Sequence, residues 1–440
     1  MAKDTPKSFK NLVIYSIYVR NHSLEGTFNA VTRDLDRIKK MGVDVVWLMP
    51  IHPIGKKNKK GSLGCPYSIS DYRSVNPEYG TLADFQELIA ASHQLGLKVM
   101  IDVVYNHTAH DSILVREHPE FFHQDTQGNP VTTVPDWSDV IDLKHPHPEL
   151  TRYLIDSLKY WVSIGVDGFR CDVASLVPAE FWQQARREVS EVKPGVIWLA
   201  ESVHAVFVET RRQEKLFAIS DSEIYTAFDL TYDYDIWPMF QHTVKGDLPV
   251  KRLLEMYRFQ HAIYPANFIK MRYVENHDQS RIRQTVPDTN QALAWTAFEA
   301  FNDGAWLIYA GQEAGEDHTP SLFEKDIVRW NGYPFQDLLT RLNGIKKHPA
   351  VSEGFLLFLE TEPVIQVAWK ANTVHLYGIF NVEGQKGKVQ VHIPNGCYTD
   401  LISGRVVNVI AGKMDIPEVA IILETSTLLK NQQFFSELLD

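Results

Sequence analysis

Carboxylates stand at or beside the C-terminal ends of four short apolar runs in this sequence. They are Asp102, Asp172, Glu201 and Asp278. If the runs are parallel strands of one sheet, the carboxylates converge on one face, because active-site residues gather at the carboxyl ends of such strands. Burial and crowding keep some carboxyls protonated, and nearby cations keep others ionised. That division into acid and base is what cleavage of a glycosidic bond requires.

Basic and imidazole side chains accompany these carboxylates. His107 ends the run that contains Asp102, Arg170 stands two residues before Asp172, and His277 directly precedes Asp278. Residues two apart in a strand share a face, so Arg170 is expected beside Asp172, where a guanidinium stabilises a carboxylate. Any one of these residues alone could equally well serve only to form hydrogen bonds that stabilise the end of the barrel. Four such groups in register favour a functional cluster.

Strand-like and helix-like segments alternate along the chain. The strand candidates are 12–18, 43–50, 97–105, 166–171, 197–201, 226–230, 271–275 and 306–310. Amphipathic segments at helical period separate them, at 28–41, 82–95, 150–164, 179–192, 205–219, 248–263, 291–302 and 335–345. The pattern predicts an α/β fold, a parallel (β/α)8 TIM barrel, whose strands are apolar on both faces. A doubly wound open sheet is disfavoured because no Gly-rich loop follows the first strand.

The barrel is expected to occupy residues 1–106 and 149–353. The segment 107–148, rich in His, Pro and Asp, interrupts the third repeat and is interpreted as a short excursion domain, or lid, over the barrel mouth. From 354 to 425, alternating runs separated by turns predict a C-terminal antiparallel β-sandwich. The last residues, 426–440, are expected to form a tail helix.

The four polar strand ends resemble the four signature regions of the α-amylase family of glycoside hydrolases. The matching segments are Asp102–His107, Gly168–Asp172, Glu201 with its apolar lead-in, and Asn276–Asp278. Similar motifs surround them at Glu25–Phe28, Val46–Pro50, Pro66-Tyr67, Asp71-Tyr72, Pro77–Thr81 and Gly311–Glu313. The resemblance implies that Asp172 is the nucleophile, Glu201 the general acid and then base, and Asp278 a ligand of the sugar hydroxyls. A retaining mechanism implies that the first two carboxyls lie about 5 Å apart.

The resemblance also implies sugar-binding residues around the carboxylates. His107 and His277 would donate to sugar hydroxyls, with bracing of the barrel rim as the alternative. Tyr67 would stack on the sugar at the cleavage point, unless it is ordinary core packing. Asp102 would support Arg170. Among the aromatic residues near predicted loops, Trp137 is chosen as a further subsite residue because it lies in the excursion domain.

The sequence departs from the family after the nucleophile. Val173–Leu176 replaces a Lys-His pair whose histidine contributes a ligand to a structural calcium ion in the family. Asn106 remains as a doubtful metal ligand, with Asp136, Asp139 and Asp142 as possible helpers, whereas calcium takes about six to eight oxygen ligands. We therefore expect no required cofactor and disfavour calcium. The basic loop 53–60 is interpreted as a solvated loop, or as lysines that meet the outer substrate or an anion.

Composition limits the classes of partner and compartment. The 440 residues carry a net charge of −11, which disfavours nucleic acid and anionic membranes as partners. No secretory leader is apparent, and the three cysteines, widely spaced, form no disulfide or zinc pattern. A cytoplasmic location is therefore expected, and the oligomeric state stays open.

These observations predict a retaining, α-amylase-like hydrolase of α-1,4 bonds in maltooligosaccharides, starch or glycogen-type glucans. The first alternative is a transglycosylase or a sucrose- or α-1,6-active enzyme with the same site. A non-catalytic carbohydrate-binding protein and a metal-dependent TIM-barrel enzyme are the alternatives of other classes.

Overall fold

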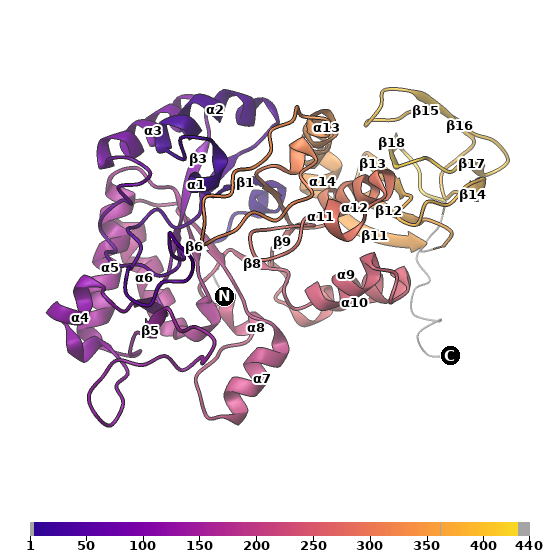
Figure 1. Cartoon of the computed structure of the whole chain (residues 1–440). Helices are drawn as coiled ribbons and strands as arrows, with labels where there is room; N and C mark the ends of the chain where they lie inside the picture. The colour runs from indigo at the N-terminus through magenta and orange to yellow at the C-terminus, as the bar shows by residue number, and fades with distance from the viewer. Residues whose placement is uncertain (1–3, 361, 430–440) are drawn as a thin grey trace.

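The computed structural model describes residues 4–360 and 362–429. Eight parallel strands close into a barrel in the order β1-β10-β9-β8-β7-β6-β3-β2, which confirms the predicted (β/α)8 architecture (Figure 1). Their bounds are β1 Val13–Ile17, β2 Val45–Leu48, β3 Lys98–Val103, β6 Gly168–Cys171, β7 Ile197–Ala200, β8 Leu230–Tyr232, β9 Lys270–Arg272 and β10 Ala305–Tyr309.

Helices surround the strands because each presents an apolar stripe to the sheet. The longer ones are α2 Phe28–Lys40, α3 Leu82–Gln94, α5 Pro148–Ser163, α6 Ala179–Val192, α7 Ala205–Gln213, α9 Trp237–Val244, α10 Val250–Ile263, α12 Thr289–Phe301 and α13 Gln336–Lys346. Short helices are α1 Val19–His22, α4 Ile113–Glu117, α8 Asp221–Ile224, α11 Ile282–Thr285 and α14 Pro349–Glu353. Thr81 begins α3 with a capping box to Asp84, as an N-cap threonine should.

The sixth barrel strand was predicted too early in the chain. Residues 226–230 were expected to form it, but β8 begins only at Leu230. Residues 226–229 instead lie in the turn that follows α8, a short helix capped by Ser220, whose hydroxyl accepts from the Glu223 N–H. In this turn the Thr226 and Ala227 N–H groups donate to the carbonyls of Glu223 and Ile224, so the chain enters the sheet later and the loop after β8 starts at Asp233.

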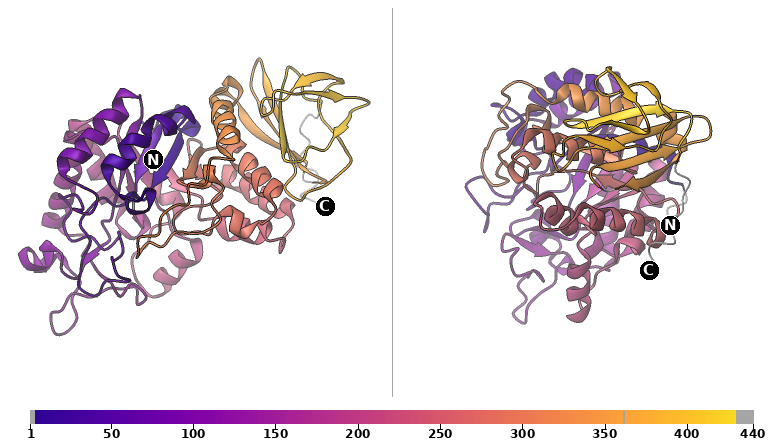
Figure 2. Two further views of the ribbon diagram at one scale, coloured as in Figure 1. Left: turned by 45° about the horizontal axis from the view of Figure 1, so that its top comes forward. Right: turned by 90° about the vertical axis from the view of Figure 1, so that its right-hand side faces the viewer.

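The excursion and the C-terminal region contain antiparallel sheets. In the excursion, β4 His107–Ala109 pairs with β5 Val140–Asp142. The C-terminal region has a four-stranded sheet, β11-β12-β13-β18, and two two-stranded antiparallel sheets, β14-β17 and β15-β16, as the predicted sandwich requires (Figure 2). The bounds are β11 Phe355–Glu360, β12 Ile365–Lys370, β13 His375–Phe380, β14 Lys388–Gln390, β15 Gly396–Thr399, β16 Val406–Val409, β17 Lys413–Asp415 and β18 Ala420–Thr425. Most of the predicted tail helix, 430–440, lies outside the described residues.

The barrel and the C-terminal sheet share one apolar core. Trp369 of β12 is buried and its indole N–H donates to the Phe301 carbonyl at the end of α12, at 2.8 Å. Apolar residues of β12 and β13 belong to the same buried cluster as the barrel.

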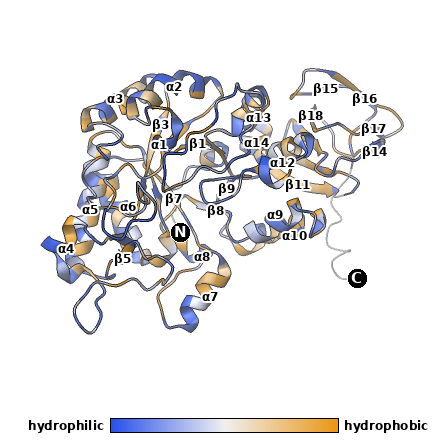
Figure 3. Ribbon diagram, viewed as in Figure 1, coloured by the Kyte–Doolittle hydropathy of each residue, from blue (hydrophilic) through white to orange (hydrophobic). Residues whose placement is uncertain are grey.

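Among the described residues, no helix combines the length and the apolar character needed to cross a membrane. In Figure 3 polar and apolar residues alternate along most helices.

Candidate active site

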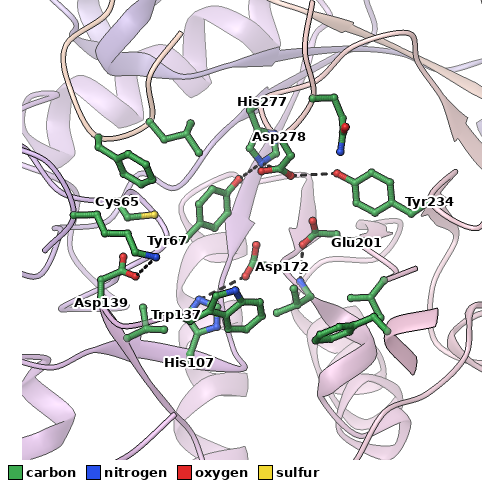
Figure 4. Close-up of a pocket in the computed structure, with 18 of the residues that line it drawn as sticks. Cys65, Tyr67, His107, Trp137, Asp139, Asp172, Glu201, Tyr234, His277 and Asp278 are labelled. Carbon is green, nitrogen blue, oxygen red and sulfur yellow. Dashed lines mark hydrogen bonds and ion pairs between the residues drawn. The ribbon is translucent and has the colours of Figure 1, made fainter. Parts of the chain in front are cut away.

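A cavity of about 430 Å³ opens at the carboxyl ends of the barrel strands (Figure 4). Its lining includes the three proposed catalytic carboxylates, Asp172, Glu201 and Asp278, with five further predicted or neighbouring site residues: Tyr67, His107, Trp137, Tyr234 and His277. Its size falls within the range of about 300–1,000 Å³ that is usual for ligand sites. The residues that the sequence brings to four strand ends therefore surround one space.

Asp172 directly follows β6 and lies next to Arg170 of the same strand. The Arg170 Nη1 donates to Asp172 Oδ1 at 2.7 Å, a charge-assisted hydrogen bond. The other carboxylate oxygen, Oδ2, lies 3.8 Å from His107 Nε2. One oxygen of Asp172 is thus fixed by a cation, while the second faces the cavity side.

Arg170 is fully buried and links three carboxylates. Its Nη1 also donates to Asp102 at 3.0 Å, and its Nη2 lies 3.0 Å from Glu201 Oε2, outside hydrogen-bond geometry. Its Nε donates to the Tyr232 hydroxyl at 3.1 Å. Asp102 thus helps to hold the Arg170 guanidinium in place. Burial raises the pKa of the Asp102 carboxyl to about 8.

Glu201 directly follows β7 and is 7% exposed. Burial, and secondly the neighbouring Asp172 charge, raises the pKa of the Glu201 carboxyl well above its ordinary value, against the opposing effect of Arg170. Glu201 Oε2 accepts a hydrogen bond from the Val173 N–H at 2.8 Å. A carboxyl whose pKa is raised in this way is suited to donate a proton.

The residue after Asp172 has an unusual backbone. Val173 adopts φ 34° and ψ 45°, in the left-handed region that a β-branched residue rarely occupies. Such strain concentrates at functional sites. Here it aims the Val173 N–H at Glu201, and so couples the two strand ends that carry Asp172 and Glu201.

Asp278, His277 and Tyr67 form the opposite wall of the cavity. The Tyr67 hydroxyl lies 2.7 Å from His277 Nε2 and donates to Asp102 at 3.1 Å, while its ring stacks on His277 at 5.5 Å and 16°. His277 Nε2 is also 3.2 Å from Asp278 Oδ2. Burial lowers the pKa of His277 to about 4, so its imidazole is neutral at pH 7.

Tyr234 and His204 are site residues that the sequence reasoning missed. The Tyr234 hydroxyl donates to Asp278 Oδ2 at 3.2 Å. His204 stacks on Tyr234 at 4.8 Å, and its Nδ1 lies 2.9 Å from the Tyr234 carbonyl. The signal was present in the polar Asp233–Asp235 segment after β8, but the early placement of that strand hid it.

Trp137 reaches the cavity from the excursion, and its ring lies 5.2 Å from that of His107. The other aromatic candidates are placed elsewhere: Tyr232 lies behind Arg170, and Phe169, Phe228 and Trp237 are buried in the core. Trp330 packs on His22.

The side chains near Asn106 do not fit a calcium ion. The Asn106 amide nitrogen lies 3.2 Å from His107 Nδ1, and Asp142 Oδ2 accepts from the Thr133 N–H at 2.7 Å. Asp139 is paired with the Lys60 ammonium at 2.9 Å, where a metal would need a free oxygen. Within residues 4–360 and 362–429, no group of three or more His, Cys, Asp or Glu side chains is arranged to hold a metal.

Comparison with known families identifies the family of the chain. The model of the α-amylase catalytic domain matches residues 5–129 and 134–336, and that of the bacterial α-amylase C-terminal domain matches residues 358–423. The chain belongs to the α-amylase family of glycoside hydrolases. The predicted resemblance is therefore confirmed.

Two crystal structures resemble this chain over nearly its whole length. An α-amylase from Lactobacillus plantarum is 41% identical, with a TM-score of 0.92, over 96% of this chain and 100% of that one. The maltogenic α-amylase AmyB from Thermotoga neapolitana is 31% identical, with a TM-score of 0.86 and the same coverage. The α-amylase MalA of Haloarcula japonica is 29% identical over 71% of this chain, which spans only 45% of that relative.

Proposed function

We propose that the protein is a retaining hydrolase of α-1,4-glucosidic bonds in maltooligosaccharides and related glucans. The observation that carries this proposal is the pairing of Asp172 and Glu201 around Arg170. The two terminal nitrogens of one guanidinium lie 2.7 Å and 3.0 Å from the two carboxyls. One carboxyl has the charge-assisted bond that a nucleophile needs, and the other has the raised pKa that an acid needs.

Strand register supports retention. Cys171 of β6 pairs with Ala200 of β7, so Asp172 and Glu201 each directly follow a registered pair on adjacent strands. Adjacent strands lie about 4.8 Å apart. A retaining pair needs a carboxyl separation of roughly 5 Å, whereas an inverting pair needs roughly 6.5–9.5 Å.

The proposed reaction has two steps. Asp172 attacks the anomeric carbon and forms a glycosyl ester, while the Glu201 carboxyl gives its proton to the departing glycosidic oxygen. Glu201 then takes a proton from water, whose oxygen attacks the same carbon and releases Asp172 as a carboxylate. Asp278 and the neutral His277 are placed to bind ring hydroxyls, and Tyr67 is placed to stack on the sugar.

An apolar surface beside the acid supports a second candidate function. Four apolar residues line the cavity and pack with the buried cluster of Leu176, Val208 and Ala218, and one of them, Val173, donates its N–H to Glu201; the four are Trp137, Val173, Val203 and Phe207. The leaving chain must depart past Glu201, so the same surface would hold an incoming sugar and compete with water. Transglycosylation, with sucrose- and α-1,6-active variants of the reaction, is therefore the second proposal.

The test is product release from maltoheptaose, soluble starch, pullulan and sucrose by the wild type and by Asp172→Ala. Short maltooligosaccharides from the first two substrates, absent with the variant, would support α-1,4 hydrolysis. NMR of the first-formed product decides retention, since a β-anomer would refute it. Longer products that appear only with an added sugar acceptor would establish the second candidate.

A reducing compartment, with the cytoplasm as the expected one, is also proposed. Cys65, Cys171 and Cys397 are all free thiols. Disulfides are uncommon in reducing compartments, so the absence of a pair among these three residues agrees with that location.

A further inference from the structure

The cavity has two ends that the chemistry distinguishes. The acid must stand beside the bond's leaving oxygen, so the leaving chain lies on the Glu201 side. The sugar that becomes bonded to Asp172 lies over Tyr67, and its chain continues away from Glu201. In Figure 4, Glu201 and Tyr234 lie on one side of Asp172, and Cys65 and Asp139 lie on the other. The end at Cys65 is therefore the donor end, which receives the non-reducing end of the chain.

Two loops form the lining of the donor end. The loop after β2 contributes Lys60 and Cys65, and the loop after β10 contributes Leu322 and Phe323. In the closed barrel, β2 and β10 flank β1. The two loops therefore meet above β1, across the end of the cavity.

The two loops are in direct contact. The Leu63 N–H donates to the Phe323 carbonyl at 3.1 Å, and the Ser62 N–H donates to Glu324 Oε1 at 2.7 Å. Gly61 has φ +65°, and a Cβ there would lie 2.6 Å from Phe323 Cβ, too close for any other residue without a shift. The two loops are thus joined at this point by two hydrogen bonds and a close approach of Gly61 to Phe323.

A buried arginine holds both loops from below. Arg20 of α1, with 1% of its side chain exposed, donates from Nη1 to the Gly64 carbonyl at 3.2 Å and to the Leu322 carbonyl at 3.3 Å. Its charge is balanced by Glu78, with Nη2 at 2.8 Å. A buried charge persists only where partners satisfy it. Here those partners include a carbonyl from each loop, so the arginine fixes one loop against the other.

Lys60 joins the first loop to the excursion. Its Nζ lies 2.9 Å from Asp139 Oδ1 and donates to the Asp136 carbonyl at 3.1 Å. The Asp139 side chain is 5% exposed and the Lys60 side chain is 37% exposed. The buried Asp139 carboxylate therefore holds the Lys60 ammonium in place, and Lys60 still lines the cavity. The loop 56–64 is thus tied on both sides, to the excursion and to the loop after β10.

We propose that these contacts close the donor end, so that the enzyme binds the non-reducing end of a glucan and releases short units of fixed length from it. This proposal rests on the proposed α-glucan hydrolysis and specifies where along the chain that reaction occurs. Lys60, Leu322 and Phe323 are the residues that meet the terminal sugar. Lys60 offers a donor for its hydroxyls, and the two apolar side chains limit the space beyond it. A cavity of about 430 Å³ accommodates a few sugar units rather than a continuous chain.

The experiment compares two maltoheptaosides with a chromogenic group at the reducing end. One is unmodified, and the other carries an ethylidene group across the terminal 4- and 6-hydroxyls at the non-reducing end. The wild type should cleave the blocked substrate at least about 10-fold to 100-fold more slowly, the effect of forcing a group into a filled site. Cleavage of both at similar rates, with mixed internal products, overturns this inference alone. Cleavage of neither overturns the proposed function and this inference with it.

Two variants test whether these residues form the closed end. Phe323→Ala removes a side chain from the wall but keeps the carbonyl that Leu63 binds, and Glu324→Ala removes the exposed carboxylate that holds Ser62. Each should raise the rate on the blocked substrate relative to the unmodified one by about fivefold or more. Phe355→Ala, at an exposed phenylalanine of β11, is the matched control and should leave the ratio unchanged. A ratio that Phe323→Ala and Glu324→Ala also leave unchanged would refute the assignment.

Discussion

Replacing Glu201 by Gln removes the proton that the proposed acid donates while preserving its shape. The amide oxygen can take the place of Oε2, which accepts from the Val173 N–H at 2.8 Å and faces Arg170. The amide nitrogen then takes the place of Oε1. The variant is therefore expected to fold, and its loss of activity reports on proton transfer rather than on packing.

The magnitude follows from the role. General acid catalysis contributes about 10²-fold to 10⁴-fold, or about 2.7–5.4 kcal/mol of transition-state stabilisation. The rate on maltoheptaose should fall by that factor. On α-maltosyl fluoride, whose leaving group departs without protonation, the first step should fall less than about tenfold.

The pH profile gives an independent measure. The pKa of Glu201 is raised, so the proton-donating form persists above the ordinary range of a carboxyl and activity is lost as pH rises through that raised value. Glu201→Gln should abolish this alkaline limb. The same shift favours the folded state below the carboxyl's ordinary pKa, and this stabilisation is lost as pH rises through the raised value. The variant should therefore show a smaller decline of stability over that interval.

The assay is kcat/KM on both substrates from pH 4 to pH 9, with Glu209→Gln, at an exposed position of α7, as the control. Equal losses on the two substrates would refute the acid role, because the fluoride does not need the proton. An unchanged alkaline limb in the variant would assign that limb to another group.

Three further predictions follow from other contacts. Tyr234→Phe deletes the hydrogen bond to Asp278 and should lower kcat/KM about 3-fold to 10-fold, measured on maltoheptaose; no change would exclude a positioning role for Tyr234. Exhaustive treatment with a chelator should leave the rate and the thermal midpoint unchanged, because Lys60 already neutralises Asp139; a loss restored by calcium would contradict this. Trp182→Ala, at a fully buried indole, should cost about 3–5 kcal/mol in urea unfolding, and a loss below about 1 kcal/mol would contradict the packing.

Much of the barrel and of the candidate active site could be predicted because the signal was local. The strand ends that carry Asp172 and Glu201 follow short apolar runs, and in a barrel such ends must converge. Where strands are buried on both faces, composition alone identifies them. The exposed pair β15-β16 carries no such signal, since most of its residues face solvent and show no apolar period.

The loops above the barrel could not be predicted in the same way. Nothing near Arg20 in the sequence shows that it is buried, because arginine is ordinarily exposed and its partners come from residues far along the chain. The sequence left two interpretations of the basic loop 53–60 open. The structure shows that Lys60 of this loop contacts Asp139 and lines the cavity. Loop contacts of this kind depend on tertiary distance, which neither composition nor periodicity encodes.

Charge balance around Arg170 explains why similar carboxyls acquire different roles. One guanidinium contacts Asp102, Asp172 and Glu201, so a single positive charge cannot offset three buried negative charges. Burial raises the pKa of Asp102 to about 8 and that of Glu201 well above its ordinary value, which favours the protonated form of both carboxyls. Asp172 has the shortest contact with the guanidinium, at 2.7 Å, because it stands two residues further along the same strand. In the proposed mechanism, the position of Arg170 in β6 thus favours Asp172 as the attacking carboxylate, and burial at the end of β7 favours Glu201 as the proton donor.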